Sequence, residues 1–353
     1  MRPTAVRPAA VMRLLATTVP RPPPPVVFFY NDVYEVPRGP ALPATNSFPM
    51  EKYRLVRDVL EREIDSSRAI FRESPLASLD DLHMVHERSY VVRFLSNELS
   101  REENRRIGFP WSAASVNRAL SSTGGTVAAM AATFQEGGPR YAAQIAGGTH
   151  NAYADRGEGY CVFSDIAVAA AVALRDYPEE VRRVLIVDLD VHQGNGNAAI
   201  FSADPRVFTF SMHCEANIFS KREASDLDVD LPAGTGDAEY LAALGEALPR
   251  AFEASAPDLV FFQSGVDCHA SDRFGRLALS SAGLKRRNAA VFAAAAARGS
   301  RLVLTMGGGY PRSLDVRAAP FHHVVQAHAD CYRQCAASHA AAWRGIAARQ
   351  ASR

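Results

Sequence analysis

Cysteine is scarce in this sequence and forms no metal-binding pattern. The five cysteines are an odd number, lie scattered along the chain and include no Cys-x-x-Cys pair; they are Cys161, Cys214, Cys268, Cys331 and Cys335. Such a distribution argues for free thiols in a reducing compartment. We therefore expect neither a disulfide framework nor a zinc site built from cysteines.

The chain also lacks an excess of either charge and lacks a long apolar run. Its 39 Lys and Arg nearly balance its 38 Asp and Glu, so no long-range field would hold it on nucleic acid or on an anionic membrane. No apolar run approaches the roughly 20 residues that a helix needs to span a bilayer. We expect no nucleic-acid and no membrane partner, whereas a small-molecule or peptide substrate fits. The oligomeric state is left open.

Acidic residues are missing from the first part of the chain, where the first one is Asp32. Residues 1–25 carry four arginines, several Thr and Ala, and a closing run of prolines. This composition suits an organelle transit peptide, which would place the protein in a mitochondrion or chloroplast. A disordered, proline-ended tail on a cytoplasmic protein is the alternative, and the sequence leaves both open.

Short apolar runs rich in β-branched residues alternate with longer alanine-rich segments. Such runs are typical of buried parallel strands, and they lie at residues 26–30, 141–146, 184–191, 206–212, 258–263 and 301–306. Helical apolar spacing marks residues 165–177, 238–255 and 281–299, and a terminal helix is expected from residue 323. The alternation predicts one α/β domain over residues 26–345, an open and mostly parallel sheet with helices on both faces, followed by a frayed end at 346–353.

Polar and glycine-rich sequence follows five of the expected strands: GGTHN, DLDVHQGNGN, HCEAN, SGVDCH and GGGY. In open α/β sheets the ligand site lies beyond the carboxyl ends of the strands. In DLDVH, an extended backbone would point Asp188, Asp190 and His192 to one face. Two desolvated carboxylates repel each other unless a cation or a proton intervenes. Zinc accepts Asp and His ligands, so Asp190 and His192 are candidate ligands, with Asp267 from another strand end as the third. Alone, the pattern would also fit a solvated strand end.

At this point the sequence resembles the histone deacetylase and acetylpolyamine amidohydrolase superfamily, most closely its class IV-like and bacterial members. The matching segments are FPMEKYRLVRDVL (48–60), GGTHNAYADRGEGYCVFSDIAVAA (147–170), VLIVDLDVHQGNG (184–196), EASDLDVDLPAGTGDAEYLAAL (223–244), GVDCHASDRFGRLALS (265–280) and MGGGY (306–310). They cover most of residues 26–335 in the family's order. The resemblance implies an arginase/deacetylase-like fold and zinc-dependent hydrolysis of an acyl-lysine, an acylated peptide or a small acyl-amine.

The resemblance also assigns roles to individual positions. It implies that Asp190, His192 and Asp267 bind Zn²⁺, and that the hydroxyl of Tyr310 donates to the developing oxyanion. Asp188 would orient the active-site histidine. That histidine is His150. A potassium ion would lie at main-chain carbonyls near these residues, with Met212 and the Ser211 hydroxyl. Gly159 and Tyr160 would line the acyl tunnel, and Gly308 would contact substrate beside Tyr310. A loop anchor remains an alternative for Tyr310, and plain core packing for Tyr160.

One position departs from the family pattern. Most members have two adjacent histidines, whereas this chain has His150 followed by Asn151. The second histidine usually serves as general base and then general acid, and an amide has no pKa near neutrality with which to do so. Asn195 stands where many deacetylases have an aspartate that supports that histidine, although class IV-like members also carry asparagine. Such proton transfer contributes about 10² to 10⁴ in rate.

Three outcomes are open for a site that lacks the second histidine. Hydrolysis could persist slowly with His150 moving the proton. The site could instead run another zinc-dependent reaction, such as ester hydrolysis, hydration or elimination on a small molecule. As a third outcome, the pocket could bind an acyl ligand or a peptide without turnover. The sequence alone does not choose among them.

Overall fold

One eight-stranded sheet runs through the structure, which is a computed structural model describing residues 22–35, 38–43 and 45–351. The strand order is β2-β1-β3-β8-β7-β4-β5-β6, and every neighbouring pair is parallel. The strands are β1 (Val26–Tyr30), β2 (Ala69–Glu73), β3 (Tyr141–Gln144), β4 (Val184–Asp188), β5 (Val207–Cys214), β6 (Leu227–Leu231), β7 (Leu259–Gln263) and β8 (Arg301–Thr305). The segment 1–25, expected as a transit peptide or tail, lies outside the described residues up to residue 21.

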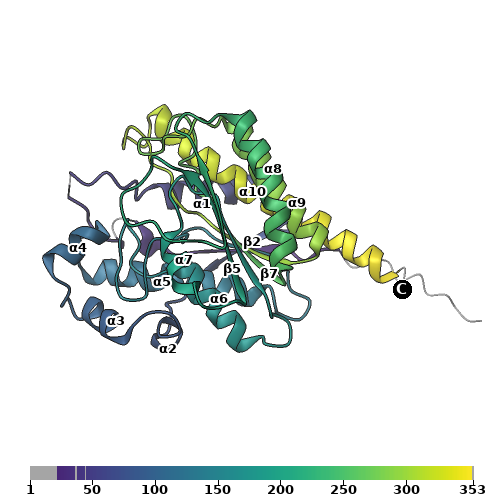
Figure 1. Ribbon diagram of the computed structural model, residues 1–353, viewed down its shortest axis with the longest axis horizontal. Coiled ribbons are helices and arrows are strands. Elements are labelled where there is room, and N and C mark those ends of the chain that lie inside the picture. The colour runs from purple at the N-terminus through teal and green to yellow at the C-terminus, as the bar shows by residue number, and fades with distance from the viewer. Residues whose placement is uncertain (1–21, 36–37, 44, 352–353) are drawn as a thin grey trace, which may run out of the picture.

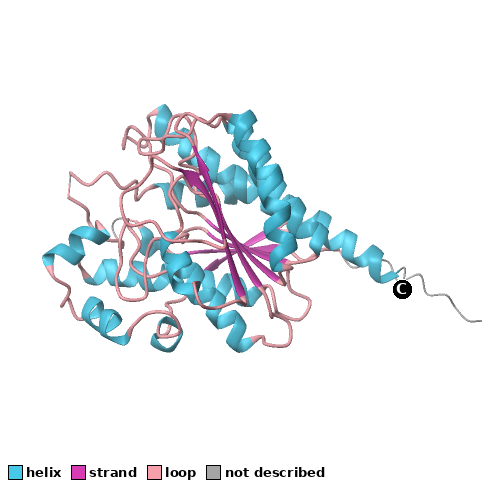
Figure 2. Cartoon of the chain, viewed as in Figure 1, coloured by secondary structure: helices cyan, strands magenta, loops and turns pink. Residues whose placement is uncertain are grey.

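Helices cover both faces of this sheet, as Figures 1 and 2 show. Helices α5 and α6 pack together on one face with α7, while α8, α9 and α10 follow one another on the opposite face and α1 packs against α10. The helices are α1 (Lys52–Glu63), α2 (Leu79–Leu82), α3 (Arg88–Leu95), α4 (Arg101–Ile107), α5 (Ala113–Ala132), α6 (Asp165–Asp176), α7 (Asn195–Phe201), α8 (Asp237–Ser255), α9 (Ser281–Arg298) and α10 (Ala319–Ala351). The expected α/β fold, an open sheet between two helix layers, is confirmed.

Local sequence explains where the central elements begin and end. Strands β1, β4 and β7 are buried at every position, as apolar runs between two helix layers require. The side chains of Ser164 and Ser280 accept hydrogen bonds from the first turns of α6 and α9, so each serine caps a helix N-terminus. Helix α10 extends to Ala351, so the end expected to be frayed from residue 346 is helical up to that point.

The two edge strands, β2 and β6, were not among the expected strands. Each pairs on one side only, and most of their residues are half-buried or exposed. Their sequences, AIFRE and LDVDL, therefore carry charged residues and lack the continuous apolar run that marks an interior strand. An edge strand is specified mainly by the neighbour that it pairs with, which a single sequence does not display.

The expectation of a strand running through DLDVH is wrong. Strand β4 ends at Asp188, which pairs with Ser211 of β5 and Gln263 of β7. Beyond it, local hydrogen bonds replace the ladder: the Asp190 amide donates to Asp188 Oδ1 (3.2 Å), and the His192 amide donates to Asp190 Oδ1 (3.0 Å). The two residues therefore reach the site from a turn and not by alternation along a strand.

The parallel arrangement brings the polar strand ends to one edge. Strands β3, β8, β7 and β4 are consecutive neighbours in the middle of the sheet, so the segments that follow them leave the same edge side by side. These segments carry His150, Tyr310, Asp267 and Asp190, respectively. Among the described residues, no helix is long and apolar enough to cross a membrane.

Candidate active site

A cavity of about 340 Å³ opens at this edge of the sheet. Most of the predicted site residues line it, namely His150, Asn151, Gly159, Tyr160, Asp190, His192, Gly308 and Tyr310. Asp188, Asp267, Ser211 and Met212 lie behind this lining, each of them almost fully buried. The structure thus gathers the predicted residues in and directly behind one cavity.

The three predicted zinc ligands lie together at the cavity wall. Their ligand atoms all lie within 4.8 Å of one another. His192 Nδ1 is 3.1 Å from Asp190 Oδ1 and 3.3 Å from Asp267 Oδ2. Two carboxylates and one imidazole at such spacing offer three ligand atoms to one metal ion, which is the number of protein ligands that a catalytic zinc site usually has.

The remaining oxygens of the two carboxylates are fixed by hydrogen bonds from their surroundings. Asp190 Oδ2 accepts from the Gly308 amide and from Gln263 Nε2, both at 2.9 Å. Asp267 Oδ1 accepts from the Val191 amide at 2.9 Å, whereas its Oδ2 is buried and has no hydrogen-bond partner. A buried carboxylate oxygen without a partner is costly, and a metal ion bound beside it would remove that cost. The residues present therefore fit a divalent metal.

The charges of the triad conflict in the way that the sequence suggested. Burial, together with the negative charge of Asp190, raises the pKa of Asp267 to about 7. Burial would lower the pKa of His192, but its hydrogen bond with Asp190 and the negative charges of Asp190 and Asp267 outweigh burial and raise it to about 10. The Asp267 carboxyl is therefore only partly ionised at neutral pH, and a bound cation would favour its ionised form.

His150 is held by Asp188 behind the cavity. Its Nδ1 lies 2.7 Å from Asp188 Oδ2. Because a carboxylate accepts, Nδ1 carries the hydrogen and Nε2 is the atom left for the cavity, 3.8 Å from Asp190 Oδ1. Burial alone would lower the pKa of His150, yet the charges of Asp188 and Asp190 outweigh it and raise the pKa to about 9. This histidine can hold and release a proton in the cavity.

Asn151 is locked by a chain of amides that leads away from the cavity. Its Nδ2 donates to the Gln193 carbonyl (2.8 Å) and to Asn195 Oδ1 (2.7 Å). Asn195 in turn donates from Nδ2 to Glu158 Oε1, at 3.1 Å, which fixes the direction of both amides. The two amide hydrogens of Asn151 are therefore engaged, and only Oδ1 remains for the cavity, close enough to Gly159 that a Cβ there would lie 3.3 Å from it. Asn151 can accept a hydrogen bond in the cavity but can neither take up nor release a proton.

Tyr310 faces the triad from the turn that follows β8. Burial and the nearby charges of Asp190 and Asp267 raise the pKa of Tyr310 well above its usual value, so its hydroxyl stays a hydrogen-bond donor. The backbone amide of Tyr310 donates to Asp272 Oδ2 at 2.6 Å. Gly307 and Gly309 have φ of 69° and 150°, a left-handed backbone that glycine adopts without strain. The turn therefore presents the phenol in a fixed position.

The outer wall of the cavity is aromatic. Gly159 and Tyr160 both have positive φ, 57° and 66°, and the ring of Tyr160 lies 4.9 Å from Phe48 and 5.2 Å from Phe109. Tyr160 is only partly buried, and it lines the cavity as well as packing against the core. Such a wall suits an extended apolar chain.

Several residues at the site were not predicted as site residues. Gln263 and Asp272 hold Asp190 and Tyr310 by the hydrogen bonds given above, and Gln263 closes a predicted strand, so its position was a usable signal. Lys52 is buried, and its Nζ lies 3.1 Å from the Gly307 carbonyl. Burial lowers the pKa of Lys52 to about 8. Nothing in its local sequence distinguished it from a surface lysine at the start of a helix.

The residues expected to hold potassium lie beside Asp188, the residue that supports His150. Ser211 pairs with Asp188 across β4 and β5, and its Oγ accepts from the Gly194 amide at 3.3 Å. Met212 follows on β5 and is fully buried. The structure brings both residues next to the supporting aspartate, and their role as ion ligands stays a prediction.

Comparison with known proteins gives a consistent result. The family model described as the histone deacetylase domain matches residues 47–327. An uncharacterised protein of Picosynechococcus is 39% identical over 294 residues, which cover 83% of this chain and 93% of that protein. A histone deacetylase-like amidohydrolase of Pseudomonas aeruginosa is 31% identical over 77% of this chain and 74% of its own. Histone deacetylase 10, chloroplastic, of Oryza sativa is 30% identical over 66% of this chain, which spans only 57% of the rice protein.

Proposed function

This chain belongs to the histone deacetylase family, and we propose that it is a zinc-dependent deacylase in which Asn151 weakens proton transfer. The substrate would be either an acylated lysine within a peptide or a small acyl-amine. The observation that carries the proposal is the composition of one cavity, in which Asp190 and His192 of the buried Asp190–His192–Asp267 triad share the lining with Tyr310. A protein that used this fold without its chemistry would not need both the triad and Tyr310.

The residues of the chain divide the work of hydrolysis. When bound, zinc would acidify water and polarise the acyl carbonyl. Tyr310 would donate its hydroxyl hydrogen to the carbonyl oxygen as negative charge develops on it. His150, oriented by Asp188, would move protons at Nε2, and the aromatic wall around Tyr160 would line the approach to the reacting end and exclude water. Asn151 would contribute an acceptor at Oδ1 that orients without titrating.

The missing histidine should weigh most on the departure of an amine. An amine must be protonated as it leaves, whereas an activated alcohol leaves without that help. With His150 as the one histidine of the cavity lining that is not a proposed metal ligand, acyl-amides should lose much of the 10² to 10⁴ in rate that general acid–base catalysis contributes. Esters of the same acyl group should lose less. We therefore expect a deacylase that cleaves activated esters measurably better than acyl-lysine amides.

The proposal is tested with the full chain loaded with zinc. Acyl-lysine peptides, small acyl-amines and activated esters of the same acyl groups are compared by initial rates, with chelator-treated protein as the control. We expect zinc-dependent cleavage that is faster for the esters. Equal and high turnover of the amides would refute the proposed weakness. No cleavage of any member of a broad panel would refute the deacylase.

Asn151 also favours two further candidates. The site could catalyse a different zinc-dependent reaction, such as hydration or elimination on a small molecule, or it could bind an acyl ligand or peptide without turnover. A binding module should keep its affinity after zinc is removed, whereas either enzyme should lose it. Ligand affinity measured with and without chelator therefore separates the binding module from the enzymes.

The role of the N-terminal segment, residues 1–25, is a further proposal from the sequence. We propose that residues 1–25 direct import into a chloroplast or mitochondrion, a proposal supported by the arginine-rich composition and by the name of the rice relative. Fusion of this segment to a fluorescent protein tests it, and a cytoplasmic signal would refute it.

The class IV-like character and the potassium ion at Ser211 and Met212 are likewise proposed from the resemblance. Family membership does not fix the substrate, and the near-neutral charge together with the proposed import argues against chromatin as the substrate.

A further inference from the structure

The cavity has a buried end and an exposed mouth. Ile218, Phe219 and Arg276 line the mouth and are exposed. Tyr53, Arg118 and Ser122 line the other end, and each of them is less than a tenth exposed. The triad and Tyr310 lie in the same cavity, so an acyl group held at the triad can extend into this buried end. We call the buried end, lined by Tyr53, Arg118 and Ser122, the inner subsite.

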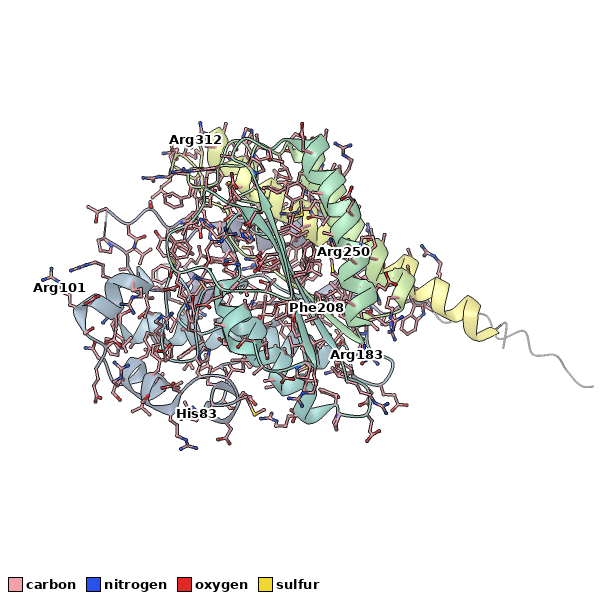
Figure 3. All side chains as sticks on the ribbon, in the orientation of Figure 1. His83, Arg101, Arg183, Phe208, Arg250 and Arg312 are labelled. Carbon is pink, nitrogen blue, oxygen red and sulfur yellow. The ribbon has the colours of Figure 1, made fainter. Side chains whose placement is uncertain are left out.

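Arg118 is unusual for an arginine of this chain. Most arginines reach solvent, as Figure 3 illustrates with Arg101 and Arg312 at the margin of the view. Arg118, on α5, is 8% exposed. Its Nη2 donates to the Tyr53 hydroxyl at 3.0 Å, while its Nε is buried without a hydrogen-bond partner. An arginine is rarely buried without an anionic partner.

No carboxylate of the described residues forms an ion pair with Arg118. The ion pairs of the described chain also omit Lys52, the second buried cation beside Tyr53. The nearest negative charges that act on Lys52 belong to Asp267 and Asp190, and these are the proposed metal ligands. A bound divalent cation would offset both carboxylates. The inner subsite would then carry the guanidinium of Arg118 with aromatic rings around it and no carboxylate beside it, and its positive field favours an anion.

Aromatic and glycine residues shape the path between the reacting end and Arg118. The Phe48 ring lies 6.3 Å from the Tyr310 ring and 5.2 Å from the Arg118 guanidinium carbon, so it flanks both. Gly147 and Gly148 line the cavity here, and a Cβ on Gly148 would collide with the backbone of Gly307. The path is therefore apolar along its side and cationic at its end. A ligand that matches it has a short apolar chain and a terminal anion.

We propose that Arg118 binds the terminal carboxylate of the acyl group, so that the preferred substrates are monoamides or monoesters of dicarboxylic acids. This inference rests on the proposed deacylase function and names its substrate class. Hydrolysis would add water across the C–N or C–O bond and release the amine or alcohol and a dicarboxylic acid. Guanidinium recognises a carboxylate through two parallel N–H donors, and the Tyr53 and Ser122 hydroxyls supply further polar groups at the same end.

Another anion would also reach this end of the cavity. Deacylation of any substrate creates a carboxylate at the reacting end, and Arg118 could attract that product instead of a second carboxylate on the chain. The two possibilities differ in what they predict for neutral acyl groups. If Arg118 serves the product alone, its loss should slow every acyl group alike. If it binds the terminal carboxylate, its loss should affect the charged acyl groups only.

A binding experiment tests the subsite without requiring turnover. Calorimetry of the zinc-loaded full chain compares succinate, glutarate and adipate with the monocarboxylates of equal length. We expect at least one diacid to bind about tenfold or more tightly than its neutral-ended partner, since hydrogen bonds to charged groups are the stronger ones. Arg118→Met should abolish this difference, and Arg118→Lys should keep part of it. Arg276→Met, which removes a cation from the exposed mouth, is the matched control and should leave the difference in place.

A kinetic experiment then compares activated esters of glutarate and pentanoate. We expect a higher kcat/KM for the glutarate ester in the unaltered protein and a selective loss of that advantage in Arg118→Met. Equal effects on both esters, or equal binding of diacids and monoacids, would overturn the inference while leaving the deacylase intact. If no ester is cleaved but glutarate binds in an Arg118-dependent way, the deacylase fails and the anion subsite stands.

Discussion

The side-chain amide of Asn151 donates a 2.7 Å hydrogen bond to Asn195 Oδ1. Asn195 Oδ1 is an acceptor that points at residue 151, and a histidine at position 151 could donate its ring N–H to the same oxygen. The direction of the Asn195 amide is set from behind by Glu158 Oε1. The pocket is thus arranged to hold an imidazole N–H although no imidazole is there.

Asn151→His should therefore raise amide hydrolysis. The imidazole Nδ1–H would donate to Asn195 Oδ1, leaving Nε2 to accept and return a proton. We expect an increase of roughly ten- to a thousandfold in kcat for acyl-lysine peptides, measured by initial rates, with a much smaller change for activated esters. Asn151→Gln is the control, because it keeps an amide without a titratable nitrogen and should show no gain. An unchanged amide rate in the histidine variant would mean that the pocket has been remodelled for another reaction.

Tyr310→Phe should lower kcat without unfolding the protein. The backbone of residue 310 is held by Asp272 and its ring by packing against Phe274, at 4.9 Å, and both contacts survive the loss of the hydroxyl. Removing one donor to a developing oxyanion costs about 10² to 10³ in rate. Steady-state kinetics should show this fall in kcat with little change in KM, and the midpoint of thermal unfolding should stay near that of the unaltered protein. A phenylalanine variant with full activity would exclude Tyr310 from the chemistry.

Removing the metal should destabilise the fold as well as stop turnover. Without a cation, Asp267 Oδ2 is buried without a hydrogen-bond partner, in a cluster that holds a second carboxylate and His192. A ligand present at a hundred times its Kd stabilises the folded state by about 2.7 kcal/mol, so chelation should lower Tm by several degrees and added zinc should restore it. Gly308→Ala tests the site separately, because its Cβ would collide with Asp267 Oδ2. We expect weaker zinc binding in calorimetry from this variant, and undiminished affinity would argue against the triad as the metal site.

His86 should make the folded protein sensitive to acid. It is buried, its Nδ1 lies 3.0 Å from the Tyr153 carbonyl, and its Nε2 accepts from the Ser164 amide at 3.0 Å. Burial lowers the pKa of His86 to about 4, against about 6.5 in the unfolded chain. The unfolded state therefore binds the proton first, so stability is fully present above pH 6.5 and falls as the pH drops toward 4.

The loss linked to His86 should amount to about 3 kcal/mol across that window. Chemical denaturation of the zinc-loaded protein at a series of pH values measures the total, and NMR titration of the His86 ring isolates its own share. His86→Gln offers an amide in place of the imidazole and should flatten part of the pH dependence. A His86 pKa close to 6.5 in the folded protein would contradict the prediction.

The interior strands could be predicted well from the sequence because a strand that is buried on both faces consists almost entirely of apolar residues. The buried runs that became β1, β4 and β7 are apolar at nearly every position, which helix layers on both faces demand. The edge strands β2 and β6 are partly exposed and contain no continuous apolar run, so this pattern did not identify them. The turn after Asp188 was also hidden, since it depends on side-chain hydrogen bonds between neighbouring residues and not on periodicity.

At the site, the sequence supplied residues whose chemistry is unusual in their local context. Asp190, His192 and Tyr310 stood out because polar groups followed apolar strands, and the structure gathers them. Lys52 and Arg118 did not stand out, because each lies on a helix where a cation is ordinary. Their burial depends on contacts between distant parts of the chain, such as the hydrogen bond between Arg118 and Tyr53, which lie 65 residues apart. The inner subsite could therefore be seen only in three dimensions.

The turn from Gly307 to Tyr310 joins parts of the site that would otherwise be independent. The Gly308 amide holds a proposed metal ligand, Tyr310 carries the proposed oxyanion donor, and the Gly307 carbonyl binds Lys52 near the inner subsite. A shift of this turn by a single residue would misplace all three together. A substitution in the aromatic wall or the mouth would change one contact at a time, whereas a change in this segment would affect all three contacts at once. Anyone who transplants the pocket to another scaffold must move these four residues as one rigid unit.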